Sequence, residues 1–401
     1  MTFMKVNQMK LTLPNYENSI IGIPNSIMKY FGVEPIGKTL PLLDQTFEKK
    51  PYKNVVVFCI DGLGVNVLEG NLDKNGFLRG HLAGTISSVF PPTTVAATTS
   101  LQSGLMPCSH SWLGWECYYP QVDKNIVVFR NTEQGTGTPA AEYHIANTYT
   151  GYRSVQSRFE QAGKQAYVVS PFEYPYPDSL EKVCNSIEAL CLEEGQKYIY
   201  AYSPEPDRTL HQYGCFGDES KEVLKQIENR LEILCKNLWD TLVVITADHG
   251  FIDCRGVCIK DYPVIMESLV RMPSIEPRAL NLFVEEEKKQ PFEEEFYRQF
   301  GNDFLLLTKE EVLEKQLFGT GKEHDCFRDM LGDYLAVATG DLAIFNTHDD
   351  VARFKAGHAG LTKQELDVPL ILFDFREDLK RFSAKFWGDD GKEPAIIPLD
   401  D

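Results

Sequence analysis

The residues of this chain that could do chemistry stand in four short motifs, each holding an aspartate or a histidine. The motifs IDG, PDRTLH, TADHG and GHAG supply Asp61, Asp207, His211, Asp248, His249 and His358. Carboxylates and imidazoles together are common ligands of zinc and other first-row metals. Each motif alone has an ordinary explanation, since an Asp-Gly pair often forms a turn and an i, i+4 Asp/His pair can be a solvated helix face. Their joint occurrence favours one shared site.

A further motif, SSVFPPTTVAATTSLQSG, could supply a nucleophile. Pro91 and Pro92 suit the entry to a helix, and Gly104 suits its end. A threonine at that N-terminus would hold its hydroxyl where backbone N–H groups favour an anion. A hydroxyl is a weak nucleophile until a metal lowers its pKa. Thr93 and Thr94 are therefore either helix caps or, beside metal ligands, candidate nucleophiles.

The elements that must position these residues alternate between strand and helix. Strands are predicted at 54–60, 165–170, 197–203, 241–247 and 368–375, and helices at 95–103, 153–163, 179–195 and 219–238. This alternation predicts an α/β fold with a mainly parallel central sheet and helices on both faces. Ligands of such sheets bind beyond the carboxyl ends of the strands, and Asp61 and Asp248 directly follow two of them.

Residues 260–340 interrupt this rhythm with short elements joined by Gly and Pro. We predict that they fold as a smaller inserted cap subdomain. Residues 1–259 and 341–401 then form the core that carries the metal ligands. The first 50 residues are predicted to pack on the outside of this core and to include a helix near residue 25.

The composition limits the partners that this chain can have. Its formal net charge is -18, from 58 acidic and 40 basic residues, which repels a long nucleic acid or an anionic membrane. A small anionic substrate stays possible, because bound divalent metals invert the local potential. Ten cysteines without a CxxC pair, no 18-residue apolar stretch and no signal-like N-terminus lead us to expect a cytoplasmic protein with reduced thiols.

The ordered set IDG, PPTT…SLQSG, PDRTLH, TADHG and GHAG resembles the alkaline phosphatase superfamily. It is most similar to the type I phosphodiesterase/nucleotide pyrophosphatase branch, over roughly residues 53–255 and 340–375. The resemblance implies two metal sites. It assigns one metal to Asp207, His211 and His358, and the other to Asp61, Asp248, His249 and Thr94. Mixed Asp/His ligation favours Zn²⁺, with Mn²⁺ possible, over Mg²⁺.

The resemblance also implies Thr94 as the nucleophile, ten residues before Gly104, as in that branch. The expected activity is a two-metal phosphoric ester hydrolase that forms a phospho-threonine and acts on a small phosphate ester, of which a nucleotide is one candidate. A phosphomonoesterase or a phosphosugar mutase of the same superfamily is the alternative, and a non-catalytic metal-binding scaffold is the alternative from another class. A set of aromatic side chains is open to two readings, a stacking wall for a base or ordinary packing. These are Trp112, Trp115, Tyr118 and Tyr119.

Overall fold

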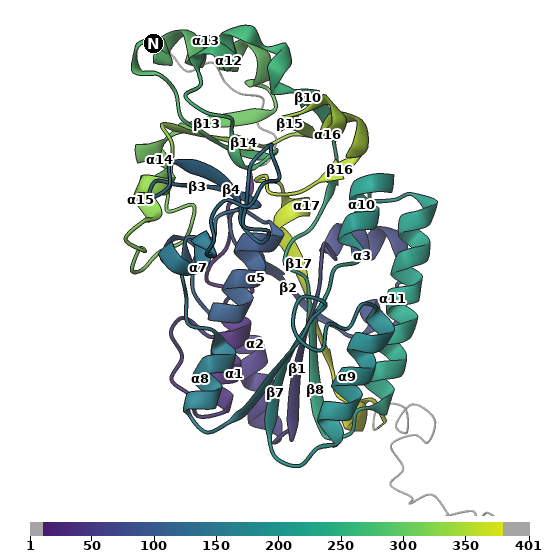
Figure 1. The fold of residues 1–401 in the computed structure, drawn as a ribbon. Helices are drawn as coiled ribbons and strands as arrows, with labels where there is room; N and C mark the ends of the chain where they lie inside the picture. Colours follow the sequence, from purple (N-terminus) through teal and green to yellow (C-terminus); the bar gives the residue numbers. More distant parts are fainter. Residues whose placement is uncertain (1–10, 380–401) are drawn as a thin grey trace, which may run out of the picture.

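A six-stranded sheet forms the centre of the larger part of the molecule in the computed structural model, which describes residues 11–379 (Figure 1). Its order is β2-β17-β8-β1-β7-β6. The strands are β2 (Leu82–Ser87), β17 (Asp367–Phe373), β8 (Thr241–Thr246), β1 (Asn54–Ile60), β7 (Lys197–Ser203) and β6 (Gln165–Val169). The predicted strands at 54–60 and 197–203 match β1 and β7 at both ends. Every residue of these two strands is buried, as their continuous apolar and aromatic runs require.

The sheet is mixed rather than wholly parallel. Strand β1 pairs in parallel with β7 and β8, and β6 pairs in parallel with β7. Strand β17 runs antiparallel to both β8 and β2. The late strand predicted at 368–375 therefore joins the same sheet in the reverse direction, and β1, β7 and β8 are three parallel neighbours whose carboxyl ends meet at one edge.

Helices cover both faces of this sheet (Figure 1). One layer holds α1 (Gly22–Tyr30), α2 (Pro41–Lys49), α5 (Thr94–Ser103) and α8 (Val155–Gln161). The other holds α3 (Val65–Asn71), α4 (Phe77–Gly80), α9 (Leu180–Leu192) and α11 (Asp218–Asn237). The helices predicted at 153–163, 179–195 and 219–238 are α8, α9 and α11. Helix α9 begins after Ser179, whose side chain accepts a hydrogen bond from the Lys182 N–H and caps the first turn.

A second, seven-stranded antiparallel sheet stands beyond that edge, in the order β13-β14-β12-β11-β3-β4-β5. The predicted insertion at 260–340 supplies β11 (Ser274–Glu276), β12 (Ala279–Leu282), β13 (Phe304–Thr308) and β14 (Tyr334–Ala338). The strands β3 (Glu116–Tyr119), β4 (Lys124–Val127) and β5 (Thr132–Glu133) come from the part predicted as core. The insertion thus does not form a sheet of its own, because β11 pairs with β3 through Ile275 and Glu116.

We call the seven-stranded sheet and the helices packed on it the second layer, as distinct from the core built on the six-stranded sheet. Helices and short strand pairs complete the second layer and its junction with the core. The helices α12 (Pro263–Ser268), α13 (Lys289–Phe300), α14 (Lys309–Glu314) and α15 (Phe327–Met330) belong to the second layer, and the junction has α6 (Pro107–His110), α7 (Ile145–Tyr149), α10 (Asp207–Tyr213), α16 (His348–Arg353) and α17 (Lys363–Leu366). Two further two-stranded sheets pair β9 (Ile252–Asp253) with β16 (Ala356–Gly357) and β10 (Arg255–Cys258) with β15 (Leu342–Phe345).

The two layers are joined by a buried ion pair. The Arg278 guanidinium, 1 % exposed, donates to both oxygens of the Glu365 carboxylate at 2.7 and 2.8 Å. Glu365 also accepts from the Gly360 N–H and the Thr362 hydroxyl. This network fixes the turn that follows the GHAG motif against the start of β12.

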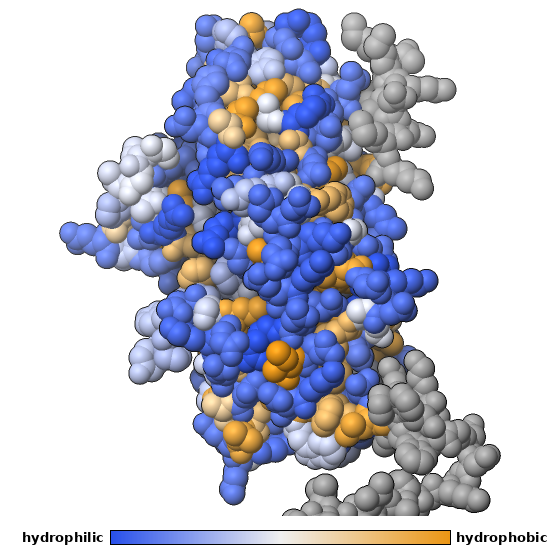
Figure 2. All heavy atoms as spheres, turned by 90° about the vertical axis from the view of Figure 1, so that its right-hand side faces the viewer, coloured by the Kyte–Doolittle hydropathy of each residue, from blue (hydrophilic) through white to orange (hydrophobic). Residues whose placement is uncertain are grey.

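The face in Figure 2 is mostly hydrophilic, and its apolar side chains are scattered rather than gathered in one patch. Among the described residues, no helix is both long and apolar enough to cross a membrane. All ten cysteines are free thiols.

Candidate metal centre

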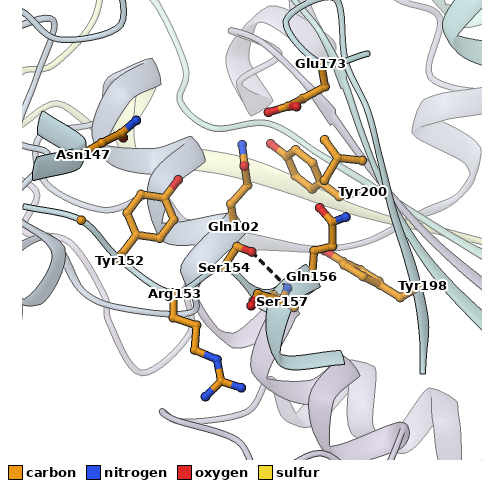
Figure 3. A pocket seen from close by; sticks show the side chains of 13 residues that line it. Gln102, Asn147, Tyr152, Arg153, Ser154, Gln156, Ser157, Glu173, Tyr198 and Tyr200 are labelled. Atoms are coloured by element: carbon orange, nitrogen blue, oxygen red, sulfur yellow. Dashed lines mark hydrogen bonds between the residues drawn. The ribbon is translucent and has the colours of Figure 1, made fainter. Parts of the chain in front are cut away.

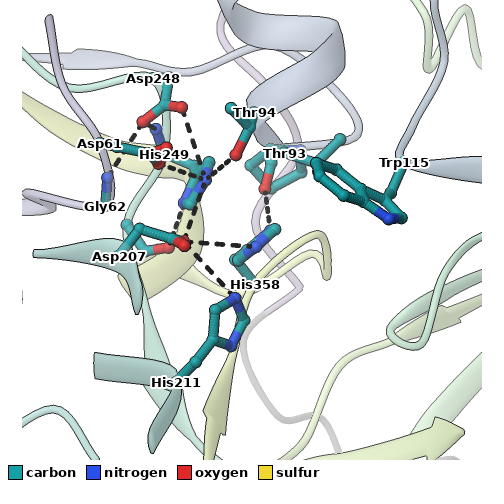
Figure 4. A network of polar contacts seen from close by, with 12 residues as sticks. Asp61, Gly62, Thr93, Thr94, Trp115, Asp207, His211, Asp248, His249 and His358 are labelled. Atoms are coloured by element: carbon teal, nitrogen blue, oxygen red, sulfur yellow. Dashed lines mark hydrogen bonds and ion pairs between the residues drawn. The ribbon is translucent and has the colours of Figure 1, made fainter. Parts of the chain in front are cut away.

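Three aspartates lie at the carboxyl ends of three adjacent strands. Asp61 follows β1, Asp248 follows β8 after one residue, and Asp207 opens α10 shortly after β7. Because β1 lies between β7 and β8 in the sheet, these ends converge, and Figure 4 shows the three carboxylates facing one another.

Each of these carboxylates keeps one buried oxygen without a hydrogen-bond partner among residues 11–379. The oxygens are Oδ1 of Asp61, Oδ1 of Asp207 and Oδ2 of Asp248. The other oxygen of Asp61 accepts from the Tyr202 hydroxyl, and that of Asp248 accepts from the backbone N–H groups of Gly62 and His249. Buried carboxylate oxygens are costly without a partner, so three that face one another fit a site for cations.

The three histidines are oriented in one common way. Their Nδ1 atoms lie 2.8, 3.1 and 3.2 Å from backbone carbonyl oxygens, for His211, His249 and His358 respectively. A carbonyl can only accept, so each Nδ1 carries the proton and each Nε2 keeps its lone pair. This is the arrangement of metal-bound histidines, whose second nitrogen donates to a protein oxygen.

The free Nε2 atoms face the unpartnered carboxylate oxygens. His249 Nε2 lies 3.3 Å from Asp61, 3.6 Å from Asp248 and 4.0 Å from Asp207. Asp207 Oδ1 lies 3.5 Å from His211 Nε2 and 3.8 Å from His358 Nε2.

Two sets of potential ligands follow from these distances. One is Asp61, Asp248 and His249, and the other is Asp207, His249 and His358, with the ligand atoms of each set within 4.8 Å of one another. All six Asp and His residues singled out in the sequence lie in this one cluster. His211 touches it through Asp207 without belonging to either compact set.

Burial shifts the pKa values of the aspartates and histidines in the cluster so that the neutral form of each is favoured. It raises the pKa of Asp61 to about 7 and that of Asp248 to about 8. It also raises the pKa of Asp207 well above its usual range, where the neighbouring Asp61 and Asp248 add to the effect. Burial lowers the pKa of His211 to about 4, and it lowers the pKa of His358 well below its usual range. Bound cations would offset the carboxylate repulsion and keep the imidazoles as neutral ligands.

The structure separates the two candidate threonines. The Thr94 hydroxyl lies 3.2 Å from His249 Nε2 and faces the cluster (Figure 4). Thr93 is the N-cap residue of α5 by position, and its hydroxyl donates to Oε1 of Glu276 at 2.6 Å. Helix α5 ends at Gly104, which takes a left-handed conformation with φ of 74°, as the sequence predicts for the end of this helix. The hydroxyl beside the potential metal ligands is that of Thr94.

The model of the type I phosphodiesterase/nucleotide pyrophosphatase family matches residues 55–290, which is more than half of the chain. The chain belongs to this family. As a type I phosphodiesterase relative, it is a divalent-metal-dependent phosphoester hydrolase of the alkaline phosphatase superfamily.

Solved structures of similar fold include other members of the superfamily. The murine ectonucleotide pyrophosphatase/phosphodiesterase 5, an inactive variant with a threonine replaced by alanine and in complex with AMP, matches with a TM-score of 0.61 and 16% identity, over 81% of this chain and 88% of that one. The human protein matches at 0.61 and 15%, over 80% and 87%. The Sinorhizobium meliloti phosphonoacetate hydrolase, in complex with phosphonoformate, matches at 0.60 and 15%, over 80% and 89%.

Two residues that contact the cluster or the start of α5 lie outside the motifs singled out in the sequence. The hydroxyl of Tyr202 donates to Asp61. The sequence carries a signal for this residue, since KYIYAYS places tyrosines on one face of β7 at every second position. Glu276 holds Thr93 and the Trp115 N–H from the second layer. No sequence signal points to Glu276, because its role depends on the packing of two layers.

The aromatic residues after α5 do not form one wall. Trp112 and Tyr119 are 5% and 0% exposed and belong to the core of the second layer. Tyr118 packs against Phe283 on the second layer. Trp115 is 36% exposed and stands beside Thr93 in Figure 4, so it is the member of the set that borders the site.

Proposed function

We propose that this chain hydrolyses small phosphate esters, preferentially diesters, by transferring the phosphoryl group first to Thr94 and then to water. The observation that carries the proposal is the Thr94 hydroxyl lying 3.2 Å from His249 Nε2, at the N-terminus of α5 and beside three unpartnered carboxylate oxygens. The family match supports phosphoester hydrolysis in general, and the diester preference and the phospho-threonine are our inference.

The first step forms a bond between Thr94 Oγ1 and phosphorus and breaks the bond to the leaving oxygen. The hydroxyl proton leaves Thr94, and the departing alkoxide takes up a proton. In the second step water displaces Thr94 from phosphorus, one proton of that water returns to Thr94 Oγ1, and the phosphate monoester is released. The N-terminal N–H groups of α5 favour the negative charge of the phosphoryl oxygens throughout.

We further propose two divalent ions as the resident cofactor. Asp207, His211 and His358 would hold one, and Asp61, Asp248, His249 and Thr94 would hold the other. When bound, they would lower the pKa of the Thr94 hydroxyl and stabilise charge on the leaving oxygen. Mixed oxygen and nitrogen donors favour Zn²⁺ or Mn²⁺ over Mg²⁺.

The nature of the organic group is inferred from the rim of the site. Trp115 borders it with part of its indole exposed, and the guanidinium of Arg130 lies 5.5 Å from the centre of that ring. An aromatic face and a cation suit a planar anionic group, and a nucleotide has both a base and phosphates. AMP, present in the complex of the murine ectonucleotide pyrophosphatase/phosphodiesterase 5, supports a nucleotide as the first substrate to test.

The decisive experiment compares a chromogenic aryl phosphodiester with the matching phosphomonoester, each with and without chelator. We expect turnover of the diester that stops on chelation and returns with Zn²⁺ or Mn²⁺. Faster turnover of the monoester would favour the phosphomonoesterase alternative. Phosphate transfer between sugar positions without release would favour a mutase, and stable metal binding with no turnover of any ester would favour a scaffold.

A further inference from the structure

Glu276 brings a carboxylate from the second layer to the start of α5. It is the last residue of β11, and its Oε1 accepts from the Thr93 hydroxyl at 2.6 Å and from the Trp115 N–H at 2.9 Å. Thr93 and Thr94 stand side by side in Figure 4, with Trp115 beyond Thr93. The carboxylate therefore binds the neighbour of the residue whose hydroxyl faces the metal centre.

Only one of the two Glu276 oxygens is engaged by the protein. Among residues 11–379, Oε2 accepts no hydrogen bond, and it is not one of the fully buried polar atoms that lack a partner, so it reaches solvent. The two hydrogen bonds to Oε1 occupy both lone pairs of that oxygen. The charge of the carboxylate is thus open to a molecule that enters the site through Oε2.

The covalent geometry keeps this charge close to the nucleophile. Thr93 Oγ1 is 2.6 Å from Glu276 Oε1. Because consecutive Cα atoms lie about 3.8 Å apart, the carboxylate is within about 11 Å of Thr94 Oγ1 even in the most extended arrangement. Burial raises the pKa of Asp207 well above its usual range, and the charge of Glu276 adds to this effect after those of two other aspartates. A phosphoryl group held between Thr94 and Asp207 would meet the same repulsion, since charges in a poorly solvated site act over several ångströms.

No cationic side chain in contact with the cluster offsets this charge. Among the residues that the structure describes, the ion pairs of the three aspartates in the cluster are all with histidines. The guanidinium of Arg130 lies 5.5 Å from the centre of the Trp115 ring and forms no ion pair with Glu276. A second negative charge on the substrate therefore finds neither a lysine nor an arginine against the cluster.

Helix α5 offers its N-terminal N–H groups to a phosphoryl group, but the side chains after Thr94 add no donor in its first turn. Val95, Ala96 and Ala97 are apolar and buried. The Thr98 hydroxyl donates to the Thr94 carbonyl at 2.6 Å and is thereby used within the helix. A third phosphoryl oxygen thus has no side-chain partner from this part of α5.

A cavity of about 540 Å³ farther along α5 does not supply this partner either. Gln102 lines it from α5, beside Tyr152 and Tyr200 (Figure 3). Gln102 follows Thr94 by eight residues, which is about 12 Å along the helix. The lining of the cavity includes neither Thr94 nor any potential metal ligand, so its polar side chains do not reach the phosphoryl group.

Phosphate esters of the two classes differ in the features that Glu276 opposes. A diester has two non-bridging oxygens that share one negative charge, whereas a monoester has three that carry close to two charges. The extra oxygen and the extra charge of a monoester would meet the Glu276 carboxylate without a cationic side chain to offset it. A diester avoids both.

We propose that Glu276 makes this site select singly charged phosphodiesters over doubly charged phosphomonoesters by repelling the second charge. The inference rests on the proposed function and assigns its diester preference to one residue. Thr93 and Trp115 hold Oε1 in place, and the free Oε2 presents the charge to the substrate.

Kinetics at about pH 9 give the first test. Burial raises the pKa of Glu276 to about 7, so at about pH 9 this carboxylate and a monoester are both fully charged. Glu276→Gln keeps an acceptor oxygen for Thr93 and Trp115 but removes the charge. The ratio of kcat/KM for an aryl phosphomonoester to that for the matching diester should rise about tenfold. Glu276→Ser, a second neutral variant, should raise this ratio as well.

Binding gives a second test, which needs no turnover. Calorimetry on the metal-loaded chain at the same pH compares inorganic phosphate, a dianion, with dimethyl phosphate, a monoanion. Glu276→Gln should tighten phosphate binding about tenfold and change dimethyl phosphate binding by less than about twofold. A parent that turns over neither ester would contradict the proposed function alone, because these two affinities still measure the repulsion by Glu276.

Glu276→Asp and Glu293→Gln are the controls. The Asp variant keeps the charge and should keep the parent's preference for the diester, which separates charge from the positioning of Thr93. Glu293 is also half-buried and accepts the Tyr334 hydroxyl at 2.6 Å, but it lies on α13, far from α5 in Figure 1. Glu293→Gln removes the same net charge from the chain and should change neither the kinetic ratio nor the two affinities.

Three results would overturn the proposal. The first is a folded Glu276→Gln variant with the parent's kinetic ratio and the parent's phosphate affinity. The second is a Glu276→Asp variant that loses the diester preference as fully as Glu276→Gln. The third is an equal gain in phosphate affinity in Glu293→Gln, which would assign the effect to the net charge of the chain.

Discussion

The hydroxyl of Thr93 donates to Oε1 of Glu276 at 2.6 Å, and this bond joins the start of α5 to β11 of the second layer. The same oxygen accepts the Trp115 N–H at 2.9 Å. One half-buried carboxylate therefore holds the residue before Thr94 and the aromatic rim of the site together.

Replacing Glu276 tests this positioning. Glu276→Ala leaves the Thr93 hydroxyl and the Trp115 N–H without this acceptor, and we expect it to lower the free energy of unfolding by about 1–3 kcal/mol and to reduce kcat more than it changes KM. Glu276→Gln keeps an acceptor oxygen and should restore most of both. Chemical denaturation and steady-state kinetics measure the two effects. An Ala variant as stable and active as the parent would remove Glu276 from the positioning role.

Substitution of the two threonines should lower turnover by very different amounts. Thr94→Ala removes the proposed attacking atom, and turnover should fall by about a thousandfold or more while the melting temperature stays close to that of the parent. Thr93→Ala should cost no more than about tenfold, because it disturbs a hydrogen bond and not the attacking group. Mass spectrometry of protein acid-quenched during diester turnover should detect on Thr94, in the parent alone, a phosphoryl group that still carries its second ester. Loss of activity in Thr93→Ala with full activity in Thr94→Ala would reverse the assignment.

Metal analysis should find two equivalents of Zn²⁺ or Mn²⁺ per chain after reconstitution. Asp248→Asn and His358→Ala should each lower the bound metal, because each removes a member of one compact ligand set. Asp253→Asn is a matched control, since Asp253 lies close in sequence but binds the Cys215 N–H outside both sets. A single equivalent in protein with all six Asp and His residues intact would contradict the two-ion arrangement.

The metal-free protein should become less stable as the pH rises. Burial raises the pKa of Asp61 to about 7 and of Asp248 to about 8, so the folded chain binds more protons than the unfolded chain above the ordinary aspartate value. The contribution of these two carboxyl groups to the stability of the metal-free fold is complete below about pH 4. It is lost as the pH rises through about 7 and 8.

Bound metal should reverse this dependence, because it replaces the protons on the same carboxylates. Melting temperatures measured across this range with and without chelator would give the two curves. If the metal-free curve is flat or rises toward alkaline pH, the carboxylates do not carry the protons expected of them. Asp61→Asn should flatten part of the metal-free curve.

The buried pair between Arg278 and Glu365 gives a prediction about the GHAG turn. Arg278→Met leaves a buried carboxylate without its counter-charge, and we expect a loss of about 3–5 kcal/mol in the free energy of unfolding. The double variant Arg278→Met with Glu365→Gln should recover part of it. Denaturation curves measure the loss, and a coupling of zero between the two sites would contradict it. A folded single variant should also bind less metal, since this pair braces the turn after His358.

The central strands were predictable because their sequences leave little choice. NVVVFCI and TLVVIT are continuous apolar runs, buried along their whole length as β1 and β8. The aspartates after them could be placed at one edge by the rule for parallel sheets, and the structure brings Asp61 and Asp248 together there. The reverse direction of β17 could not be predicted, since an apolar run is compatible with both parallel and antiparallel pairing.

The partners across layers could not be predicted from local pattern. Glu276 and Thr93 are far apart in the sequence, and nothing near either indicates the other. The pairing of β11 with β3 likewise joins two distant segments through one residue pair. The sequence therefore does not reveal that residues 260–340 share a sheet with residues 116–133. Tyr202 is an intermediate case, because its face on β7 follows from alternation while its partner Asp61 does not.

The shared second sheet limits how this enzyme can be re-engineered. Excising residues 260–340 would strip β11 from β3 and expose an unpaired strand edge, which is a template for aggregation. It would also leave the Glu365 carboxylate buried without Arg278. Replacing residues 260–340 alone with a segment of another protein would therefore not preserve the fold. A working chimera would have to exchange residues 116–133 and 274–338 together, as one unit drawn from two places in the chain.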